Sequence, residues 1–197
     1  QGRLPFGEAE REHLVRLFDG NLAFADQEVG ALRRAMEAEG LWEKTVVIVA
    51  ADHGEELFER GWIGHNVHVY EPSVRVPLIV RFPKGATPAG HRVAALADLL
   101  DVAPTIADVF GALGKGGSER AFHGRSLLPV IAGAPGKPAV LSRTVWDRPR
   151  YALRGERSLV TARSDRGTPG RRPVSVAIPS SSVVATLRAS SDMSLKT

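Results

Sequence analysis

Cysteine is absent from this chain of 197 residues. Without it the chain can form no disulfide, no thiolate metal site and no cysteine nucleophile of its own. Long apolar runs are absent too: the longest, around Val46–Ala51, has the length of a strand, whereas a helix that crosses a bilayer needs about 20 residues. We therefore predict no transmembrane segment in this chain.

Aromatic side chains are scarce, and none follows Tyr151. The formal net charge is only +4, and many of the arginines fall within residues 143–172. A nucleic-acid surface needs basic residues gathered on one face with stacking aromatics among them. We therefore expect no nucleic-acid partner, and we interpret residues 146–197 as a degenerate or poorly ordered basic tail.

Apolar residues recur at helical spacing near the start of the chain. The spacing predicts a helix over Glu8–Gly40, in which Gly40 stands where a glycine ends a helix. The residues that carry this pattern are Leu22, Ala25, Val29, Leu32 and Met36. A second helical stretch is predicted over Asp98–Phe110, with Gly111 as its stop.

Two short segments are predicted as strands. Thr45–Ala51 is β-branched and apolar without polar alternation, which is typical of a strand covered on both faces in a parallel sheet. Val74–Phe82 has a similar character, and Ala139–Ser142 is a candidate for a further strand. A helix followed by a buried strand indicates an α/β fold with a mostly parallel central sheet flanked by helices.

Asp52 and His53 follow the clearest strand. Ligands of open α/β sheets gather at the carboxyl ends of strands. Both side chains can reach one ion only if the chain leaves extended geometry, which Gly54 permits. A carboxylate beside an imidazole suits a divalent cation, and calcium, magnesium, manganese and zinc all remain open. Alternatively, Asp52 caps the next turn and His53 is a surface histidine.

Several motifs together resemble the C-terminal signature of the sulfatases, which belong to the alkaline-phosphatase superfamily. They are Val47–Glu56 (VIVAADHGEE), Gly64–Asn66 (GHN), Tyr70–Ser73 (YEPS), Arg75–Ile79 (RVPLI), Asp101–Thr105 (DVAPT) and Gly124–Pro129 (GRSLLP). The helix predicted over Asp19–Leu41, with Asp26 and Gly30, resembles the family's helix before these motifs. Together they occur in order between about residues 18 and 133, at sensible spacings. The resemblance implies an alkaline-phosphatase-like sandwich, of which residues 1–145 form the C-terminal part of the catalytic domain.

The resemblance also implies a function. It is that of a sulfuric ester hydrolase with one divalent ion, usually calcium, for which Asp52 and His53 match the late pair of ligands. The family's nucleophile is a formylglycine made within a C/S-x-P-x-R motif, and this chain contains neither that motif nor the early aspartate pair. We therefore expect the formylglycine in an N-terminal half outside this sequence, and we expect the chain alone to be inactive.

Histidines after the metal pair are candidates for substrate contact. The resemblance implies that His65 is catalytic and binds the sulfate, by stabilising charge or protonating the leaving oxygen. In two-zinc relatives a histidine in this region is a metal ligand instead. His68 is a weaker candidate for the same cleft. The remaining histidines are expected at the surface: His13, His91 and His123.

Other polar residues are expected to have structural places. Arg75 is a candidate for a scaffold salt bridge with Glu71, and Trp62 either walls the substrate pocket or is simply buried. Three acidic residues are expected to form a solvated face: Glu55, Glu56 and Glu59. The family's C-terminal strand is expected to begin at Tyr151–Arg154, and the composition after Arg157 suggests a shifted reading frame.

Alternative functions remain open at this point. Phosphatases, phosphodiesterases and phosphoethanolamine-type transferases of the same superfamily share the Asp-His element and often use zinc or manganese, and fold resemblance does not separate them. An inactive truncated fragment is the third possibility. A sulfatase would act on a small-molecule or carbohydrate sulfate ester. Family members are often exported, which is compatible with a periplasmic or extracellular location.

Overall fold

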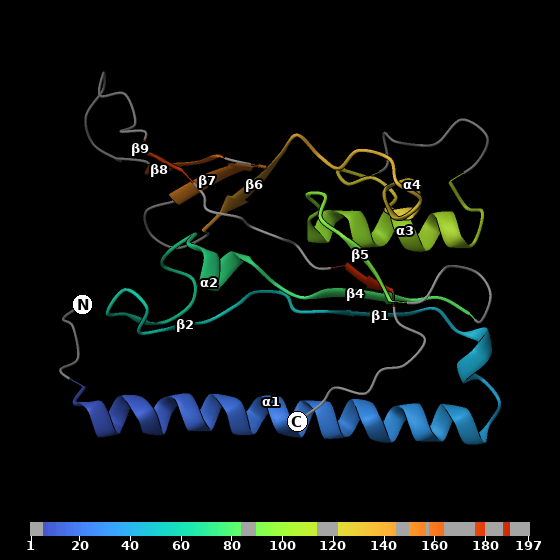
Figure 1. Cartoon of the computed structure of the whole chain (residues 1–197), viewed down its shortest axis with the longest axis horizontal. Coiled ribbons are helices and arrows are strands. Elements are labelled where there is room, and N and C mark those ends of the chain that lie inside the picture. The colour runs from blue at the N-terminus through green and yellow to red at the C-terminus, as the bar shows by residue number, and fades with distance from the viewer. Residues whose placement is uncertain are drawn as a thin grey trace.

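The computed structural model describes residues 6–83, 90–113, 122–144, 150–156, 158–163, 176–179 and 187–189. Its helical segments are α1 (Glu8–Ala38), η1 (Trp42–Lys44), α2 (Glu71–Val74), η2 (Leu99–Asp101), α3 (Val102–Val109) and α4 (Leu128–Ile131). Its strands are β1 (Val47–Ala50), β2 (Glu56–Leu57), β3 (Ile63–Gly64), β4 (Leu78–Arg81), β5 (His91–Val93), β6 (Ala139–Arg143), β7 (Arg150–Gly155), β8 (Ser158–Arg163), β9 (Val176–Pro179) and β10 (Leu187–Ala189). Figure 1 shows α1 along one side of the β1–β4 sheet and α3 with α4 on the other. This mixture agrees with the predicted α/β class.

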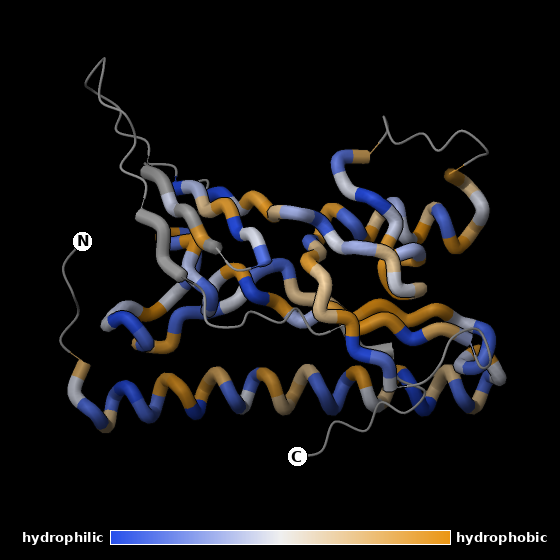
Figure 2. Tube along the Cα trace, turned by 45° about the horizontal axis from the view of Figure 1, so that its top comes forward, coloured by the Kyte–Doolittle hydropathy of each residue, from blue (hydrophilic) through white to orange (hydrophobic). Residues whose placement is uncertain are grey.

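The long helix α1 confirms the prediction for Glu8–Gly40. Gly40 has φ 64°, and its N–H donates to the carbonyl of Glu37 at 3.0 Å, while Leu41 N–H donates to Met36 at 2.8 Å. These two hydrogen bonds form the Schellman motif, which satisfies the last carbonyls of a helix. No residue of α1 is buried, so its apolar side chains stay accessible in this chain. Figure 2 shows apolar and polar residues mixed along α1, in contrast to the more apolar β1 and β4.

The strands β1 and β4 occupy the two segments predicted as strands, but their pairing differs from the prediction. They run antiparallel, with Val47 opposite Arg81 and Ala50 opposite Leu78. The sheet order is β1-β4-β10-β5, and within the described residues its parallel pair is β4 with β10. A parallel pair needs a crossover connection, usually a helix. Between β1 and β4 the chain forms only two short strands and the four-residue α2, and it returns in the opposite direction.

The main core lies between this sheet and α4. Its buried members are Leu78, Val80, Val93, Leu127 and Val130. β1 is only partly buried and lies at the edge of the sheet, so the predicted cover on both faces is not reached in this chain. Among the described helices, none has the length and apolar character of a membrane-crossing helix.

Two of the sequence motifs form one buried unit at the end of η2. Thr105 Oγ donates to the carbonyl of Asp101 at 2.6 Å and accepts the N–H of Leu127 at 2.9 Å. The Asp101 carboxylate accepts the N–H of Arg125 at 2.9 Å and pairs with Lys137 at 2.7 Å. The DVAPT motif therefore supplies hydrogen-bond partners for buried backbone groups of the GRSLLP motif.

A second sheet has the order β6-β7-β8-β9 and antiparallel pairing, and it lies near α2 (Figure 1). β6 and β7 contain the predicted strands at Ala139–Ser142 and Tyr151–Arg154. A small core joins this sheet to the loop that precedes α2, through Val69, Ala152 and Leu159. The boundary expected between residues 145 and 146 falls between two paired strands, and that division stays a prediction. Much of the expected basic tail lies outside the described residues.

Candidate functional site

The segment after β1 bends at Asp52, and its backbone approaches α2 closely at Gly54. Gly54 N–H donates to the carbonyl of Ser73 at 2.9 Å. A Cβ at Gly54 would lie 1.9 Å from the carbonyl oxygen of Pro72, a distance that no side chain tolerates. Glycine is therefore required here for a close backbone approach. This contact holds the carboxyl end of β1 beside α2.

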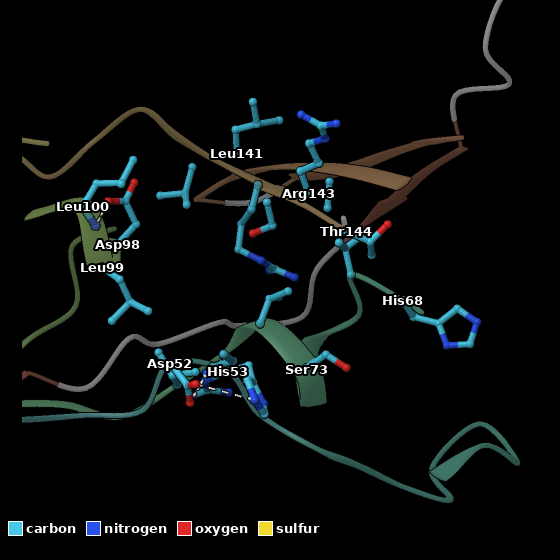
Figure 3. A pocket seen from close by; sticks show the side chains of 18 of the residues that line it. Asp52, His53, His68, Ser73, Asp98, Leu99, Leu100, Leu141, Arg143 and Thr144 are labelled. Carbon is cyan, nitrogen blue, oxygen red and sulfur yellow. Dashed lines mark hydrogen bonds and ion pairs between the residues drawn. The ribbon is translucent and has the colours of Figure 1, made fainter. Parts of the chain in front are cut away.

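Asp52 and His53 face each other at this end of β1 (Figure 3). The Asp52 side chain is 90% exposed, and its Oδ2 lies 3.7 Å from His53 Nε2. His53 Nδ1 lies 3.0 Å from the carbonyl oxygen of Gly54, which can only accept a hydrogen bond. The proton of a neutral His53 ring is thereby placed on Nδ1, and Nε2 keeps its lone pair beside the carboxylate. These two atoms form a donor set that fits a cation. Asp52 Oδ1 also accepts the N–H of His53 at 3.0 Å. The helix-capping role expected as an alternative is not formed, because β2 rather than a helical turn follows this segment.

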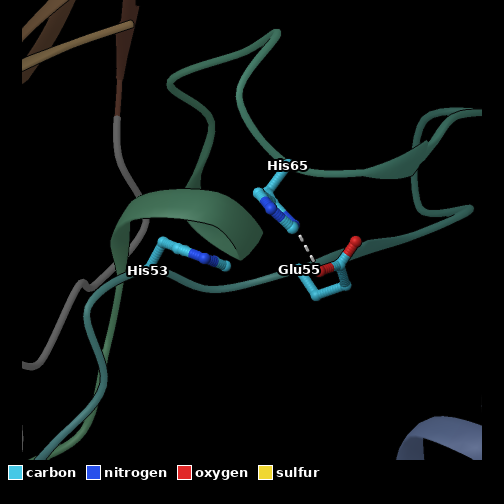
Figure 4. A group of neighbouring side chains, drawn as sticks. All are labelled: His53, Glu55 and His65. Carbon is cyan, nitrogen blue, oxygen red and sulfur yellow. Dashed lines mark hydrogen bonds and ion pairs between the residues drawn. The ribbon is translucent and has the colours of Figure 1, made fainter. Parts of the chain in front are cut away.

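His65 joins this group from the segment after β3. Its ring stacks on that of His53, with centroids 3.9 Å apart, and its Nδ1 lies 2.7 Å from Glu55 Oε2 (Figure 4). One ligand atom from each of His53, Glu55 and His65 lies within 4.8 Å of the others. The structure therefore brings His65 beside His53, while its catalytic and sulfate-binding role stays a prediction. It also adds Glu55, which was expected on a solvated face and is instead partly buried against His65.

Glu56 also contradicts the expectation of a solvated face, because it is fully buried. Its Oε1 accepts hydrogen bonds from His68 Nδ1 at 2.9 Å and from Ser73 Oγ at 3.4 Å. Of the three acidic residues only Glu59 is exposed, and it accepts the N–H of Leu57 at 2.6 Å. Glu55 directly precedes β2 and Glu56 begins it. Successive side chains of an extended chain point to opposite sides, so the two neighbouring carboxylates reach different environments.

His68 lies at the margin of the pocket (Figure 3). Glu56 holds one nitrogen of its ring, and the ring packs edge-on against Trp62 with centroids 5.8 Å apart. Trp62 is partly buried beside His68, which agrees with the expectation of simple burial rather than with a place in the pocket wall. The other histidines, His13, His91 and His123, are exposed as predicted.

A pocket of about 370 Å³ opens above Asp52 and His53. His65 lines it with them, and β6, β7 and η2 complete its walls. Its basic lining residues are Arg75, Arg143 and Arg154.

Arg154 of β7 has an ion-pair partner that sequence spacing did not indicate. It pairs with Glu71 of α2. The partner expected for the Glu71 carboxylate was the side chain of Arg75. The contact described between these two residues is a backbone one, in which the Arg75 N–H donates to the Glu71 carbonyl at 2.8 Å. Burial lowers the pKa of Arg154 from its usual value. The pair links the second sheet to α2 and closes one side of the pocket.

Comparison with known proteins places this geometry in a family context. The sulfatase family model matches residues 2–112. The multifunctional alkaline phosphatase superfamily protein PehA of Trinickia caryophylli is 32% identical over 135 residues, covering 67% of this chain and 24% of PehA. Steryl-sulfatase of Mus musculus is 37% identical over 120 residues, covering 55% of this chain and 19% of that protein.

Solved structures confirm the fold. A protein in complex with its substrate D-glucosamine-2-N,6-O-disulfate aligns with a TM-score of 0.60 and 26% identity, covering 69% of this chain and 28% of that one. This chain thus spans about a quarter or less of the length of the curated relatives named above. Because the family model covers more than half of the chain, and because the fold agrees, the chain belongs to the sulfatase family.

Proposed function

We propose that this chain forms part of a sulfuric ester hydrolase, in which Asp52 and His53 hold a divalent cation and His65 lies beside the reacting group. The observation that carries the proposal is the 3.7 Å approach of Asp52 Oδ2 to His53 Nε2 at the mouth of a pocket. Membership of the sulfatase family supports the chemistry. A cation bound there would hold the sulfate oxygens and make the sulfur more electrophilic.

His65 can move a proton at a defined atom. Glu55 accepts the hydrogen bond from Nδ1 at 2.7 Å, so Nε2 is the nitrogen left for the substrate. A protonated His65 donates from Nε2 to the leaving oxygen, while the Glu55 carboxylate stabilises the positive ring. A neutral His65 accepts a proton at the same atom. Glu55 is therefore proposed as the residue that orients His65.

The nucleophile is proposed to come from outside this sequence. The chain contains no cysteine and no C/S-x-P-x-R motif from which a formylglycine can be made. Two ligands also leave a calcium ion short of the six to eight oxygens that it prefers. The early aspartates of the family would supply the remainder, so this chain alone is proposed to bind metal weakly and to hydrolyse no ester.

Phosphoryl chemistry is the second candidate, and one observation favours it. The cluster of His53, Glu55 and His65 offers two nitrogens and one oxygen, a donor set that suits zinc or manganese better than calcium. In that case His65 is a metal ligand rather than a proton donor. The similarity to a multifunctional alkaline phosphatase superfamily protein is compatible with this alternative.

The proposed substrate is a small-molecule or carbohydrate sulfate ester. The solved relative with a sulfated glucosamine supports the carbohydrate class, and the similarity to steryl-sulfatase supports an apolar small molecule. A periplasmic or extracellular location stays a prediction.

Metal-dependent anion binding tests the proposal. Sulfate and phosphate are titrated separately into the chain by calorimetry, with calcium, with zinc and without metal. Because the chain alone is proposed to hold metal weakly, calcium is added in large excess. We then expect weak, calcium-dependent sulfate binding that Asp52→Asn abolishes and that the exposed control His91→Gln leaves unchanged. Zinc-dependent phosphate binding that disappears in His65→Gln would favour the phosphoryl alternative. Sulfate binding that ignores both metal and Asp52→Asn would refute the proposed site.

A further inference from the structure

Glu56 carries a buried carboxylate that the proposed chemistry does not use. Its side chain is 1% exposed, whereas the side chain of the neighbouring Glu55 is 22% exposed. Glu56 Oε1 accepts hydrogen bonds from His68 and Ser73, and Oε2 is buried without a partner among the described residues. Taking a carboxylate out of water is costly, and partners for only one oxygen offset little of that cost. Stability alone therefore does not explain why this position holds a carboxylate.

One bond of Glu56 leads to the proposed metal-binding pair. Ser73 of α2 donates from Oγ to Glu56 Oε1 at 3.4 Å, and the Ser73 carbonyl accepts the N–H of Gly54 at 2.9 Å. Ser73 is buried, and Gly54 directly follows His53. In the view of Figure 3, Ser73 lies on α2 between His53 and His68. A displacement of Ser73 would therefore also displace the backbone next to His53.

The other bond of Glu56 leads to the segment that carries His65. His68, three residues after His65, has its Nδ1 2.9 Å from Glu56 Oε1. Between the two histidines the chain turns at Asn66, whose φ of 77° lies in the left-handed region that asparagine tolerates. The backbone of Glu56 also pairs with Gly64 in the β2–β3 ladder, directly before His65. His65 is therefore flanked on both sides by residues that are bonded to Glu56.

Packing keeps His68 beside this carboxylate. Its ring lies edge-on to Trp62, with centroids 5.8 Å apart, and tilted against Tyr70, with centroids 5.0 Å apart. The guanidinium of Arg60 lies 4.1 Å from the centroid of the Tyr70 ring. The next residue, Val69, is buried in the small core that α2 shares with the second sheet. His68 is therefore a fixed partner, and its bond to Glu56 holds the chain after His65 in one place.

We propose that Glu56 is a positioning residue, which holds His53 and His65 at their observed separation and touches neither cation nor substrate. The two rings stack with centroids 3.9 Å apart, although they come from different segments of the chain. Glu56 is fully buried and lies outside the pocket lining, yet it is bonded to both segments. This inference rests on the proposed function, because the separation of the rings matters for binding only if the cation is held at Asp52 and His53. Residues that orient metal ligands from behind change metal affinity about 10- to 100-fold when they are replaced.

Proton NMR of the metal-free chain tests the positioning directly. Stacked rings displace each other's carbon-bound proton signals through their ring currents, so the ring signals of His53 and His65 report the stack. In Glu56→Ala we expect both sets of signals to move toward the values of unstacked histidines. Glu56→Gln should leave them in place, because its amide keeps an accepting oxygen and its NH₂ group takes the position of Oε2, which has no partner in the described part of the chain.

Calcium in large excess gives the second readout, followed by amide chemical shifts. We expect Glu56→Ala to weaken calcium binding about tenfold or more and Glu56→Gln to bind calcium as the original chain does. Thr105→Val is the matched control for lost stability, because Thr105 makes its buried hydrogen bonds to Asp101 and Leu127, outside both histidine segments. It should change neither the ring signals nor the calcium affinity.

Two milder variants keep the test informative if Glu56→Ala does not fold. Ser73→Ala removes the bond toward His53, and His68→Phe removes the bond toward His65 while keeping a ring against Trp62 and Tyr70. Each should move the ring signals in the same direction as Glu56→Ala, by a smaller amount.

The outcomes separate failure of this inference from failure of the proposed function. Moved ring signals in Glu56→Ala, together with no calcium binding by the original chain, would support the positioning by Glu56 and refute the proposed metal site. Calcium binding that Asp52→Asn abolishes and Glu56→Ala leaves unchanged would overturn the inference and leave the metal site standing. Ring signals that stay in place in every Glu56, Ser73 and His68 variant, or that move as far in Glu56→Gln or Thr105→Val as in Glu56→Ala, would also overturn it.

Discussion

Replacing Thr105 by valine should destabilise the chain strongly, although the two side chains have nearly the same shape. The Thr105 hydroxyl donates to the Asp101 carbonyl at 2.6 Å and accepts the N–H of Leu127 at 2.9 Å, and both Thr105 and Leu127 are buried. Valine removes both bonds. The first loss costs about 0.5–1.5 kcal/mol, and the buried Leu127 N–H left without a partner costs about 1–3 kcal/mol. We therefore expect the free energy of unfolding to fall by about 1.5–4.5 kcal/mol.

Urea denaturation followed by circular dichroism measures this change, with the slope of the transition checked for each variant. Thr105→Ser is the matched control, because it keeps the hydroxyl and removes one methyl group, at a cost of about 1 kcal/mol. A loss below about 0.5 kcal/mol in Thr105→Val would refute the reasoning. So would a serine variant as unstable as the valine variant, because packing rather than the hydroxyl would then explain the effect.

Three further perturbations test other parts of the fold. Arg81→Met should lower the free energy of unfolding by about 3 kcal/mol in urea, because the buried Arg81 donates to the carbonyls of Trp42 and Thr45 at 2.7 and 3.1 Å. Burial acts to lower the pKa of Lys137, but its hydrogen bonds to Asp101 and Asp98 outweigh this and raise it above 10.5. A raised pKa in the folded state stabilises the fold below pH about 10.5, and this contribution is lost as the pH rises through the folded value. In Lys137→Met the free energy of unfolding should therefore fall less steeply as the pH rises above about 10.5. The same steepness in the variant and the original chain would contradict this reasoning. Gly54→Ala should lower the melting temperature measured by circular dichroism, because a Cβ would meet the Pro72 carbonyl at 1.9 Å; an unchanged melting temperature would show that the loop can move away.

The sequence predicted the elements better than their pairing. Helical spacing and Gly40 located α1 and its end, because both signals are local. The apolar composition of β1 and β4 predicted strands, but it contains no information on which neighbour a strand has or in which direction that neighbour runs. The antiparallel pairing follows from the connection between them, in which two short strands and α2 bring the chain back without a crossover helix.

Part of the candidate site could also be predicted, because its signal is local in the sequence. Asp52 and His53 follow a strand directly, so their common location could be read from the sequence. The three acidic residues could not be told apart, because side-chain type alone does not reveal that Glu56 is buried under His68 while Glu55 holds His65. The partner of Glu71 was also missed, since Glu71 lies in α2 and Arg154 lies in β7, far along the chain.

The central claim is that Asp52 and His53 hold a divalent cation. The most direct measurement adds substoichiometric manganese to ¹⁵N-labelled chain and records which amide signals broaden, because a paramagnetic ion broadens the nuclei closest to it. The account predicts that signals of residues 52–56 and of His65 broaden first, and that Asp52→Asn removes the effect. Broadening that begins instead at the exposed acidic residues of α1, such as Glu8 and Glu12, and that Asp52→Asn leaves unchanged, would contradict the account.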